Sequence, residues 1–142
     1  MSLRDKVLPA IGSDNDARKH ARHGGNAGFV MALSSLLTIV FAYYWGMNSN
    51  REAVPANELI YTVTGSILQG AVVAYMGHRV RIGRGWIAGS LLLALWTAEM
   101  AMKIPSGTLN AGWALFHLAL MTYVLNGVRG CLYSGSSALT RA

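Results

Sequence analysis

Four long stretches that are nearly free of charged side chains limit what this chain can fold into more than any other feature. They cover residues 26–46, 58–77, 85–102 and 109–128. Each is about 20 residues long, the length that an α-helix needs to cross about 30 Å of hydrocarbon. Buried helices of soluble proteins are usually shorter and keep one polar face. The pattern therefore predicts an all-α fold, an integral membrane bundle of four transmembrane helices.

The composition agrees with a surface that faces lipid rather than water. Charged residues make up only 13% of the chain, whereas a soluble domain usually carries about a quarter. A charged side chain in hydrocarbon costs several kcal/mol, so lipid-facing surfaces exclude it. The net charge of +6 suits the cytoplasmic side of a membrane with its anionic headgroups. The chain has no basic patch interleaved with aromatic residues, so a nucleic-acid partner is not expected.

The distribution of lysine and arginine predicts the orientation of the bundle. Ten of the twelve flank the apolar stretches on one side, and only Arg51 and Lys103 fall on the other. Because cytoplasmic loops carry the excess of basic residues, both termini are expected in the cytoplasm. The chain then divides into a basic N-terminal segment at 1–25, the transmembrane domain at 26–128 and a loose cytoplasmic tail at 129–142. Seven basic residues are expected to anchor the chain at lipid headgroups: Arg18, Lys19, Arg22, Arg79, Arg81, Arg84 and Arg129.

A helix start is predicted inside the N-terminal segment. Ser13 followed by Asp16 resembles a capping box, with aspartate in place of the usual glutamate. The helix would begin near Asp14 and continue into the first apolar stretch. Earlier apolar residues recur at helical spacing, which predicts a short helix on the membrane surface. These residues are Leu3, Val7, Leu8 and Ile11.

Three segments of the chain resemble a widespread group of small bacterial four-helix inner-membrane proteins. The segments are HGGNAGFVMALSSLLTIVF near the start, LWTAEMAMK in the third stretch and YVLNGVRGCLY at the end of the fourth. The best-matched residues are Glu99, Lys103, Asn126, Gly127, Val128, Arg129 and Gly130. In that group the acid and the lysine are often adjacent, whereas here three residues separate them. The resemblance implies the fold and a location in the bacterial inner membrane, and it implies no activity.

Polar residues near or within the apolar stretches form the predicted functional cluster: Gln69, Glu99, Lys103, Asn110 and His117. An ionisable group inside a membrane is a functional candidate by default. The short connection between the third and fourth stretches predicts an antiparallel helix pair, which would bring Glu99 and His117 to similar depths, where they can relay protons. The alternative is structural. Glu99 would pair with Lys103 one turn on, and the other groups would form hydrogen bonds between helices.

A stripe of small residues runs along the second stretch. It consists of Thr62, Ser66, Gly70 and Ala74, each four residues apart. Small residues at this spacing let another helix backbone approach closely. The stripe is therefore expected to be a helix-packing surface, whose partner is another helix of the same chain or a second copy.

The motifs of the common enzyme classes are missing from the sequence. Phosphate-binding, dinucleotide-binding, nucleophile-elbow, metalloprotease and paired-cysteine patterns do not occur, and the loops are short. An enzyme is therefore not expected, nor is a cofactor or a metal. The preferred interpretation is a structural or accessory membrane protein, self-associating or a subunit of a larger membrane complex. The alternative is a small proton- or cation-coupled transporter or channel that uses Glu99 and His117.

Overall fold

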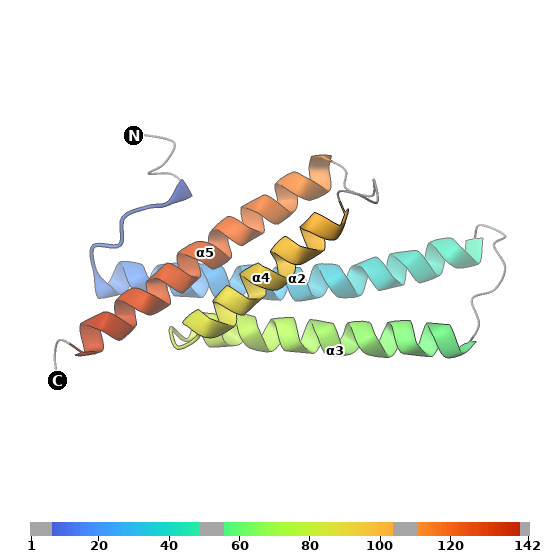
Figure 1. Cartoon of the computed structure of the whole chain (residues 1–142), viewed down its shortest axis with the longest axis horizontal. Helices are drawn as coiled ribbons and strands as arrows, with labels where there is room; N and C mark the ends of the chain where they lie inside the picture. The colour runs from blue at the N-terminus through green and yellow to red at the C-terminus, as the bar shows by residue number, and fades with distance from the viewer. Residues whose placement is uncertain (1–6, 49–55, 104–110, 140–142) are drawn as a thin grey trace.

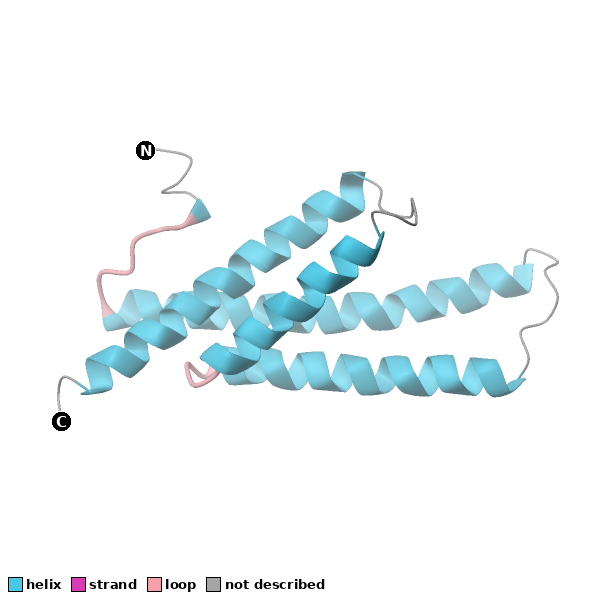
Figure 2. Ribbon diagram, in the orientation of Figure 1, coloured by secondary structure: helices cyan, strands magenta, loops and turns pink. Residues whose placement is uncertain are grey.

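Long α-helices form almost all of the part of the chain that the structure describes. This structure is a computed structural model, and it describes residues 7–48, 56–103 and 111–139. The helices are α2 (Asp14–Asn48), α3 (Ala56–Arg81), α4 (Trp86–Lys103) and α5 (Ala111–Leu139) (Figure 1). No strand occurs among the described residues (Figure 2). The prediction of an all-α chain with four long helices is confirmed.

Helix α2 begins at the predicted cap. The backbone N–H of Asp16 donates to the Ser13 hydroxyl at 3.1 Å, and that hydroxyl donates to the Asp16 carboxylate at 2.7 Å. The Ala17 N–H donates to the Ser13 carbonyl at 3.0 Å, as the first bond of the helix. These contacts satisfy part of the backbone hydrogen bonding that a helix start leaves open. The prediction of a helix start near Asp14 is confirmed.

Helices α2 and α5 extend beyond the apolar stretches. Helix α2 starts at Asp14, as the cap predicts, and so includes residues before the apolar stretch, while α5 continues to Leu139 through residues expected to form a loose tail. An apolar stretch indicates which part of a helix faces lipid or the core. It does not indicate where the helix ends, because backbone hydrogen bonding can continue into polar residues. The expected surface helix does not extend over residues 8–12, which are not helical, whereas Val7 is helical and Leu3 lies outside the described residues.

The turn between α3 and α4 is short and is closed by backbone hydrogen bonds. The Arg84 N–H donates to the Arg79 carbonyl at 3.3 Å, and the Gly83 N–H donates to the Val80 carbonyl at 2.9 Å. This is the pattern of a Schellman motif, in which the residue after the helix takes a left-handed conformation. Gly83 has a φ of 75°, which glycine adopts without strain. The turn therefore reverses the chain between α3 and α4 at low cost.

The helices form two antiparallel pairs that cross obliquely. Helix α2 packs along α3 and against α5, while α4 contacts α5 and α3 (Figure 1). Helix α2 begins, α3 turns into α4 and α5 ends at one end of the bundle, which we call the turn end. The central core is made of few and mostly small or aliphatic side chains: Ala27, Met31, Ala32, Val73, Leu92, Trp96, Leu120 and Val124.

Helix backbones come very close together near the turn end. A Cβ atom placed on Gly24 would lie 2.6 Å from Gly127 Cα, and one placed on Gly28 would lie 2.8 Å from Gly77 Cα. Real Cβ atoms do not approach backbone atoms this closely, so glycine alone fits at these contacts. We call this region the glycine crossing and define it by Gly24, Gly25, Gly28, Gly77, Gly127 and Gly130.

Among the described residues, a single helix is long and apolar enough to cross a membrane. It is the part of α5 from Ala111 to Ser136, whereas the apolar length of α4, Trp86–Met102, is shorter. Only 33% of the most apolar 18-residue window of α5 is buried within the protein. Most of this helix therefore presents its apolar side chains to the surroundings rather than to the other helices.

Candidate functional site

A cleft of about 190 Å³ brings polar side chains from all four helices together. Its lining consists of Ser34, Ser35 and Ile39 from α2, Ser66 and Gln69 from α3, Trp96 and Glu99 from α4, and Trp113 and His117 from α5. We call it the four-helix cleft. On α2, α3 and α5 its lining residues lie further from the turn end than the glycines of the crossing do.

His117 is a deeply enclosed side chain of the cleft. It is 2% exposed, and its Nδ1–H donates to the Trp113 carbonyl at 2.8 Å. Its ring contacts the Trp96 and Trp113 indoles, at centroid distances of 4.6 and 4.2 Å. Because a carbonyl only accepts, Nδ1 carries the hydrogen, and Nε2 of the neutral ring is an acceptor. The hydrogen bond and the two ring contacts therefore fix both the orientation and the tautomer of this imidazole.

The serine hydroxyls of α2 also direct their hydrogens to the backbone. Ser34 and Ser35 both donate to the Met31 carbonyl, at 2.8 and 3.1 Å. Serine commonly forms this bond to the preceding turn of its own helix. The hydrogen atoms of both hydroxyls are therefore used within α2.

Part of the predicted polar cluster meets in this cleft. Gln69, Glu99 and His117 all line it, and Glu99 is half-buried. Asn110 and the Lys103 side chain lie outside the described residues. In the part of the chain that the structure describes, no group of three His, Cys, Asp or Glu side chains is placed to hold a metal ion. The cleft is therefore built from one carboxylate, one amide, one imidazole and several hydroxyls.

Sequence reasoning missed the two tryptophans of the cleft. Trp96 precedes Glu99 by three positions, and Trp113 precedes His117 by four. Residues three or four apart share one face of a helix, so this spacing could have identified both rings as neighbours of the polar residues. Ser34 and Ser35 were missed as well, although two adjacent hydroxyls in an apolar stretch are a usable sign of an interior face.

The predicted small-residue stripe on α3 divides into an exposed part and a packed part. Thr62 is exposed and Ser66 is half-buried at the cleft. A Cβ atom on Gly70 would lie 3.3 Å from Cδ2 of Leu36 on α2, and Ala74 packs against the central core. From Gly70 onward the stripe therefore faces helices of the same chain.

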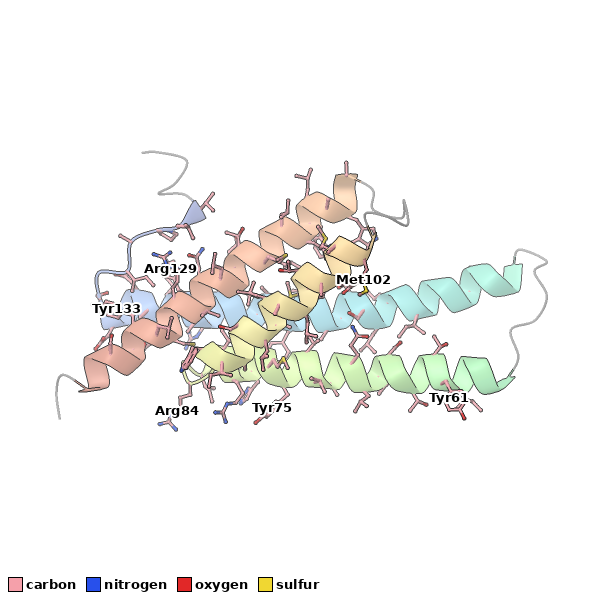
Figure 3. All side chains as sticks on the ribbon, viewed as in Figure 1. Tyr61, Tyr75, Arg84, Met102, Arg129 and Tyr133 are labelled. Atoms are coloured by element: carbon pink, nitrogen blue, oxygen red, sulfur yellow. The ribbon has the colours of Figure 1, made fainter. Side chains whose placement is uncertain are left out.

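The seven basic residues expected at lipid headgroups all lie at the turn end, with Arg84 in the turn between α3 and α4 and the other six in helices. Six of them are exposed, and Arg129 is half-buried. Figure 3 shows Arg84 and Arg129 at this end and Tyr61 at the other. The positive charge of the described residues is therefore gathered at one end of the bundle.

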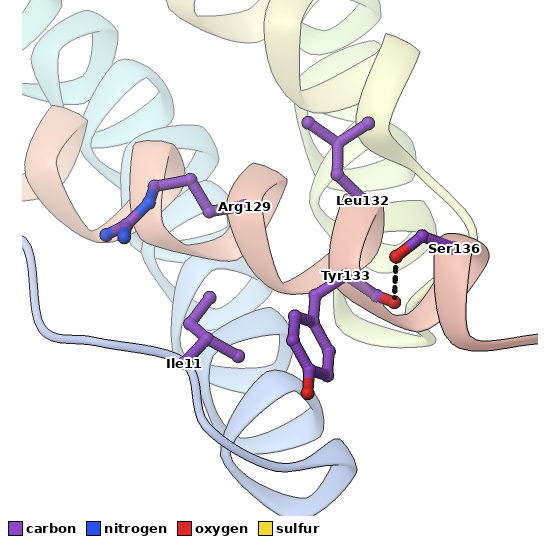
Figure 4. Close-up of a pocket in the computed structure, with 5 residues that line it drawn as sticks. All are labelled: Ile11, Arg129, Leu132, Tyr133 and Ser136. Carbon is purple, nitrogen blue, oxygen red and sulfur yellow. Dashed lines mark hydrogen bonds between the residues drawn. The ribbon is translucent and has the colours of Figure 1, made fainter.

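A shallow pocket lies beside Arg129 at the turn end (Figure 4). Its lining consists of Ile11, Arg129, Leu132, Tyr133 and Ser136. Arg129 donates to the Asn126 Oδ1 at 2.9 Å, and the Asn126 Nδ2 donates to the Val7 carbonyl at 2.9 Å. These bonds tie the segment before α2 to α5 and hold the guanidinium at the rim of the pocket.

Comparison with known proteins gives no assignment. No protein-family model matches the chain, and neither a curated protein nor a solved structure matches it. A function therefore has to be argued from the cleft, the exposed helix faces and the distribution of charge.

Proposed function

We propose that the chain is an integral membrane protein whose four helices cross the bilayer, and that it serves as a structural or accessory subunit. The observation that carries this proposal is the outward direction of the apolar side chains. Large apolar residues are exposed on every helix, among them Val40 (63%), Leu68 (65%), Leu95 (53%) and Leu115 (68%). Soluble monomers rarely expose contiguous apolar patches larger than a few hundred Å². Lipid, or another membrane protein, therefore covers these faces.

Some polar side chains of the same helices meet where the four helices come together. Gln69, Glu99 and His117 line the cleft between the helices. Polar and ionisable residues of membrane helices face the bundle interior because hydrocarbon cannot solvate them. A cleft with polar lining between helices that expose large apolar side chains therefore supports a membrane bundle over a soluble one.

The distribution of charge supports one orientation. The turn end carries the basic residues, and cytoplasmic loops carry the excess of lysine and arginine. The proposed orientation therefore has the turn end, with both termini, in the cytoplasm. Together with the resemblance to small bacterial four-helix proteins, this charge distribution supports the bacterial inner membrane as the proposed location.

A structural or accessory role is supported by an exposed strip on α4. Ile87, Leu91 and Leu95 follow one another at four-residue spacing and are 57%, 51% and 53% exposed. Residues four apart lie on one face of a helix, so these side chains form a continuous apolar surface. A second copy of the chain or a subunit of a larger membrane complex can pack on it.

Reporter fusions and solution size test this proposal. Fusions at residue 1 and residue 142 should both report a cytoplasmic position, and an external position of either one contradicts the four-span arrangement. In mild detergent the purified chain should be an oligomer or should co-purify with another membrane protein. A monomer without any partner would contradict the subunit role.

A second function is favoured by the meeting of Gln69, Glu99 and His117 in one cleft. We propose as the second candidate a small proton- or cation-coupled transporter or channel that uses Glu99 and His117. A carboxylate and an imidazole can each bind and release a proton. The cleft contacts all four helices, so a change of charge within it acts on the whole bundle.

Flux measurements separate the two candidates. Proton and cation flux should be measured in reconstituted vesicles for the wild type, Glu99→Gln and His117→Ala. Flux that both variants lose while their folding stays intact supports the transporter. Flux no higher than in empty vesicles contradicts the transporter and leaves the structural role.

A further inference from the structure

The shallow pocket at the turn end combines a positive charge with apolar walls. Four of its residues share one face of α5, at steps of three and four positions: Arg129, Leu132, Tyr133 and Ser136. Ile11, from the segment before α2, completes the lining (Figure 4). The pocket measures about 490 Å³, within the range of about 300–1,000 Å³ that is usual for small-molecule sites. A ligand in this pocket therefore meets polar and apolar groups together.

The charge of the pocket comes from Arg129. Its guanidinium donates to the Asn126 Oδ1 at 2.9 Å. That amide is neutral, so the bond orients the guanidinium without balancing its charge. A guanidinium carries several N–H donors in a planar fork that matches a phosphate group, and the Tyr133 phenol supplies a further donor. The polar part of the pocket therefore suits an anion with several oxygen atoms, such as a phosphate.

The apolar part of the pocket continues along α5. Leu132 lines the pocket, and Leu125 and Leu118 precede it at seven-residue spacing. Seven residues are nearly two helical turns, so these side chains lie on one face, where they are 48%, 40% and 53% exposed. We call them the leucine stripe. Its length is about 21 Å at 1.5 Å per residue, more than half of the hydrocarbon thickness of about 30 Å, so it can accompany an acyl chain into the bilayer.

The pocket lies at the end of the apolar part of α5. The length of α5 that is apolar enough to cross a membrane runs from Ala111 to Ser136, so the pocket occupies its last turns. In the proposed orientation this is the level of the cytoplasmic headgroups, where tyrosine is enriched and arginine reaches the interface. The cytoplasmic leaflet contains anionic lipids. A phospholipid therefore fits this position better than a free phosphate ion, because only the lipid also uses the leucine stripe.

We propose that the turn-end pocket binds one anionic phospholipid, such as phosphatidylglycerol. Arg129 and Tyr133 bind the phosphate, Ile11 contacts the glycerol part, and an acyl chain follows the leucine stripe. This goes beyond a general attraction of basic residues to headgroups, because it places a single lipid at a defined site. The inference rests on the proposed membrane location, and it holds for a structural subunit and for a transporter alike.

Native mass spectrometry of the full chain, released from a non-ionic detergent, tests the proposal by counting bound lipids. Phosphatidylglycerol is the probe, and phosphatidylcholine with the same acyl chains is the comparison, since its choline cancels the phosphate charge. One phosphatidylglycerol should bind each chain at least about fivefold tighter than phosphatidylcholine does, the factor that one basic residue near an anionic lipid contributes. Glycerol 3-phosphate, which has the charge without acyl chains, should not displace the lipid at equal concentration.

Variants place the lipid in the pocket. Arg129→Gln should weaken phosphatidylglycerol binding about tenfold or more, because it removes a charge-assisted hydrogen bond. Arg84→Gln is its control and should have a much smaller effect, because it removes the same charge from an exposed residue on the opposite side of the turn end (Figure 3). Leu132→Ala should weaken binding about threefold. Leu37→Ala is its control on α2, with a similar exposed fraction of 46%, and should leave the affinity unchanged.

Every result of these measurements bears on the pocket. Equal affinity for phosphatidylglycerol and phosphatidylcholine overturns the proposal, as does an equal loss in Arg129→Gln and Arg84→Gln, because net charge then explains the binding. Displacement by glycerol 3-phosphate overturns it too, since the site then recognises phosphate alone. If Arg129→Gln does not fold, weaker binding by Leu132→Ala but not by Leu37→Ala supports the pocket, and equal affinity of these two variants overturns it.

Reporter fusions separate a failure of this inference from a failure of the proposed function. Cytoplasmic reporters at both ends of the chain, without a preference for phosphatidylglycerol, refute the lipid site and leave the membrane bundle standing. An external reporter at either end contradicts the four-span arrangement, whatever the lipid measurements give.

Discussion

The glycine crossing and the four-helix cleft are packed by opposite means. At the crossing, the residues where α2 meets α3 and α5 have no side chains, and the backbones lie in contact. At the cleft, Ser35 lies about 16 Å further along α2 than Gly24, at 1.5 Å per residue. There the space between the helix pairs is occupied by two indoles and an imidazole.

The close packing at the glycine crossing and the open space at the four-helix cleft have the same geometric cause. Helices that meet at an angle must diverge away from the point of contact, and glycine at the contact permits the closest approach. Where the helices diverge, large side chains fill part of the space and the remainder is the cleft. The glycine crossing thus sets how closely the helices approach each other, and the four-helix cleft leaves polar side chains accessible between them.

Breaking the crossing should have the largest effect on stability. In Gly127→Leu the new side chain meets the backbone of Gly24, whose Cα lies 2.8 Å from the position of the added Cβ. Backbone cannot yield as a side chain can, so we expect a loss of about 3 kcal/mol or more. Thermal unfolding in detergent measures it. Gly135→Leu on the same helix is the control, since a Cβ there meets nothing within 4 Å. Equal unfolding temperatures of the two variants would contradict the role of the crossing.

Gly70, which lies between the crossing and the cleft on α3, should tolerate substitution by leucine better than Gly127 does. In Gly70→Leu the added Cβ meets the side chain of Leu36 at 3.3 Å, which can change rotamer. We expect a loss of about 1–2 kcal/mol without a change in oligomer size, because the contact lies within the chain. Gly65→Leu is the control on the same helix, as its Cβ meets nothing within 4 Å. A changed oligomer size for Gly70→Leu alone would mean that this face contacts a second copy.

The bonds that tie the N-terminal segment to α5 should contribute less. Asn126→Ala removes the donor to the Val7 carbonyl and the acceptor for Arg129, so we expect a loss of about 1 kcal/mol. Limited proteolysis should cut before Asp14 faster than in the wild type. Thr122→Ala removes a hydroxyl that bonds only within α5, to the Leu118 carbonyl, and should leave the cleavage rate unchanged. Equal cleavage rates in Asn126→Ala and Thr122→Ala would contradict the role of the Asn126 hydrogen bonds in holding the N-terminal segment on α5.

A pH dependence at the turn end is the smallest expected effect. Burial, reinforced by the Arg129 guanidinium, lowers the pKa of His20 from its ordinary value of 6.5, and Asp16 opposes the shift. The unfolded chain then binds this proton more readily than the folded one, so stability is complete above pH 6.5 and falls as the pH drops below it. His20→Gln should flatten this part of the stability profile, and His78→Gln, at an exposed site, should not. A profile unchanged by His20→Gln would contradict the assignment.

The sequence predicts the helices because their determinants are local. Apolar stretches of membrane length and the Ser13 cap depend only on neighbouring residues, and each corresponds to a helix or a helix start in the structure. The end of α5 is less predictable. Residues 129–139 are helical although their composition predicts a loose tail, because backbone hydrogen bonding continues where the apolar pattern stops.

The contacts between helices could not be predicted in the same way. Gly24 and Gly127 meet only because two particular helix faces turn toward each other, and spacing within one helix does not reveal which faces these are. Glu99 and His117 stand out as polar groups in apolar stretches. Trp96 does not, since a tryptophan looks equally suited to lipid until its partner helix is known.

The bond between Asn126 and Val7 joins groups 119 residues apart in the sequence. A ribosome adds about 5–20 residues per second, so roughly 6–24 s pass between the synthesis of these two partners. During that time the surfaces of α2 at Ala17 and Gly24 are not yet covered by α5. Helix α2 is thus covered by α5, a helix synthesised later, so α2 cannot reach its final packing until α5 has been made.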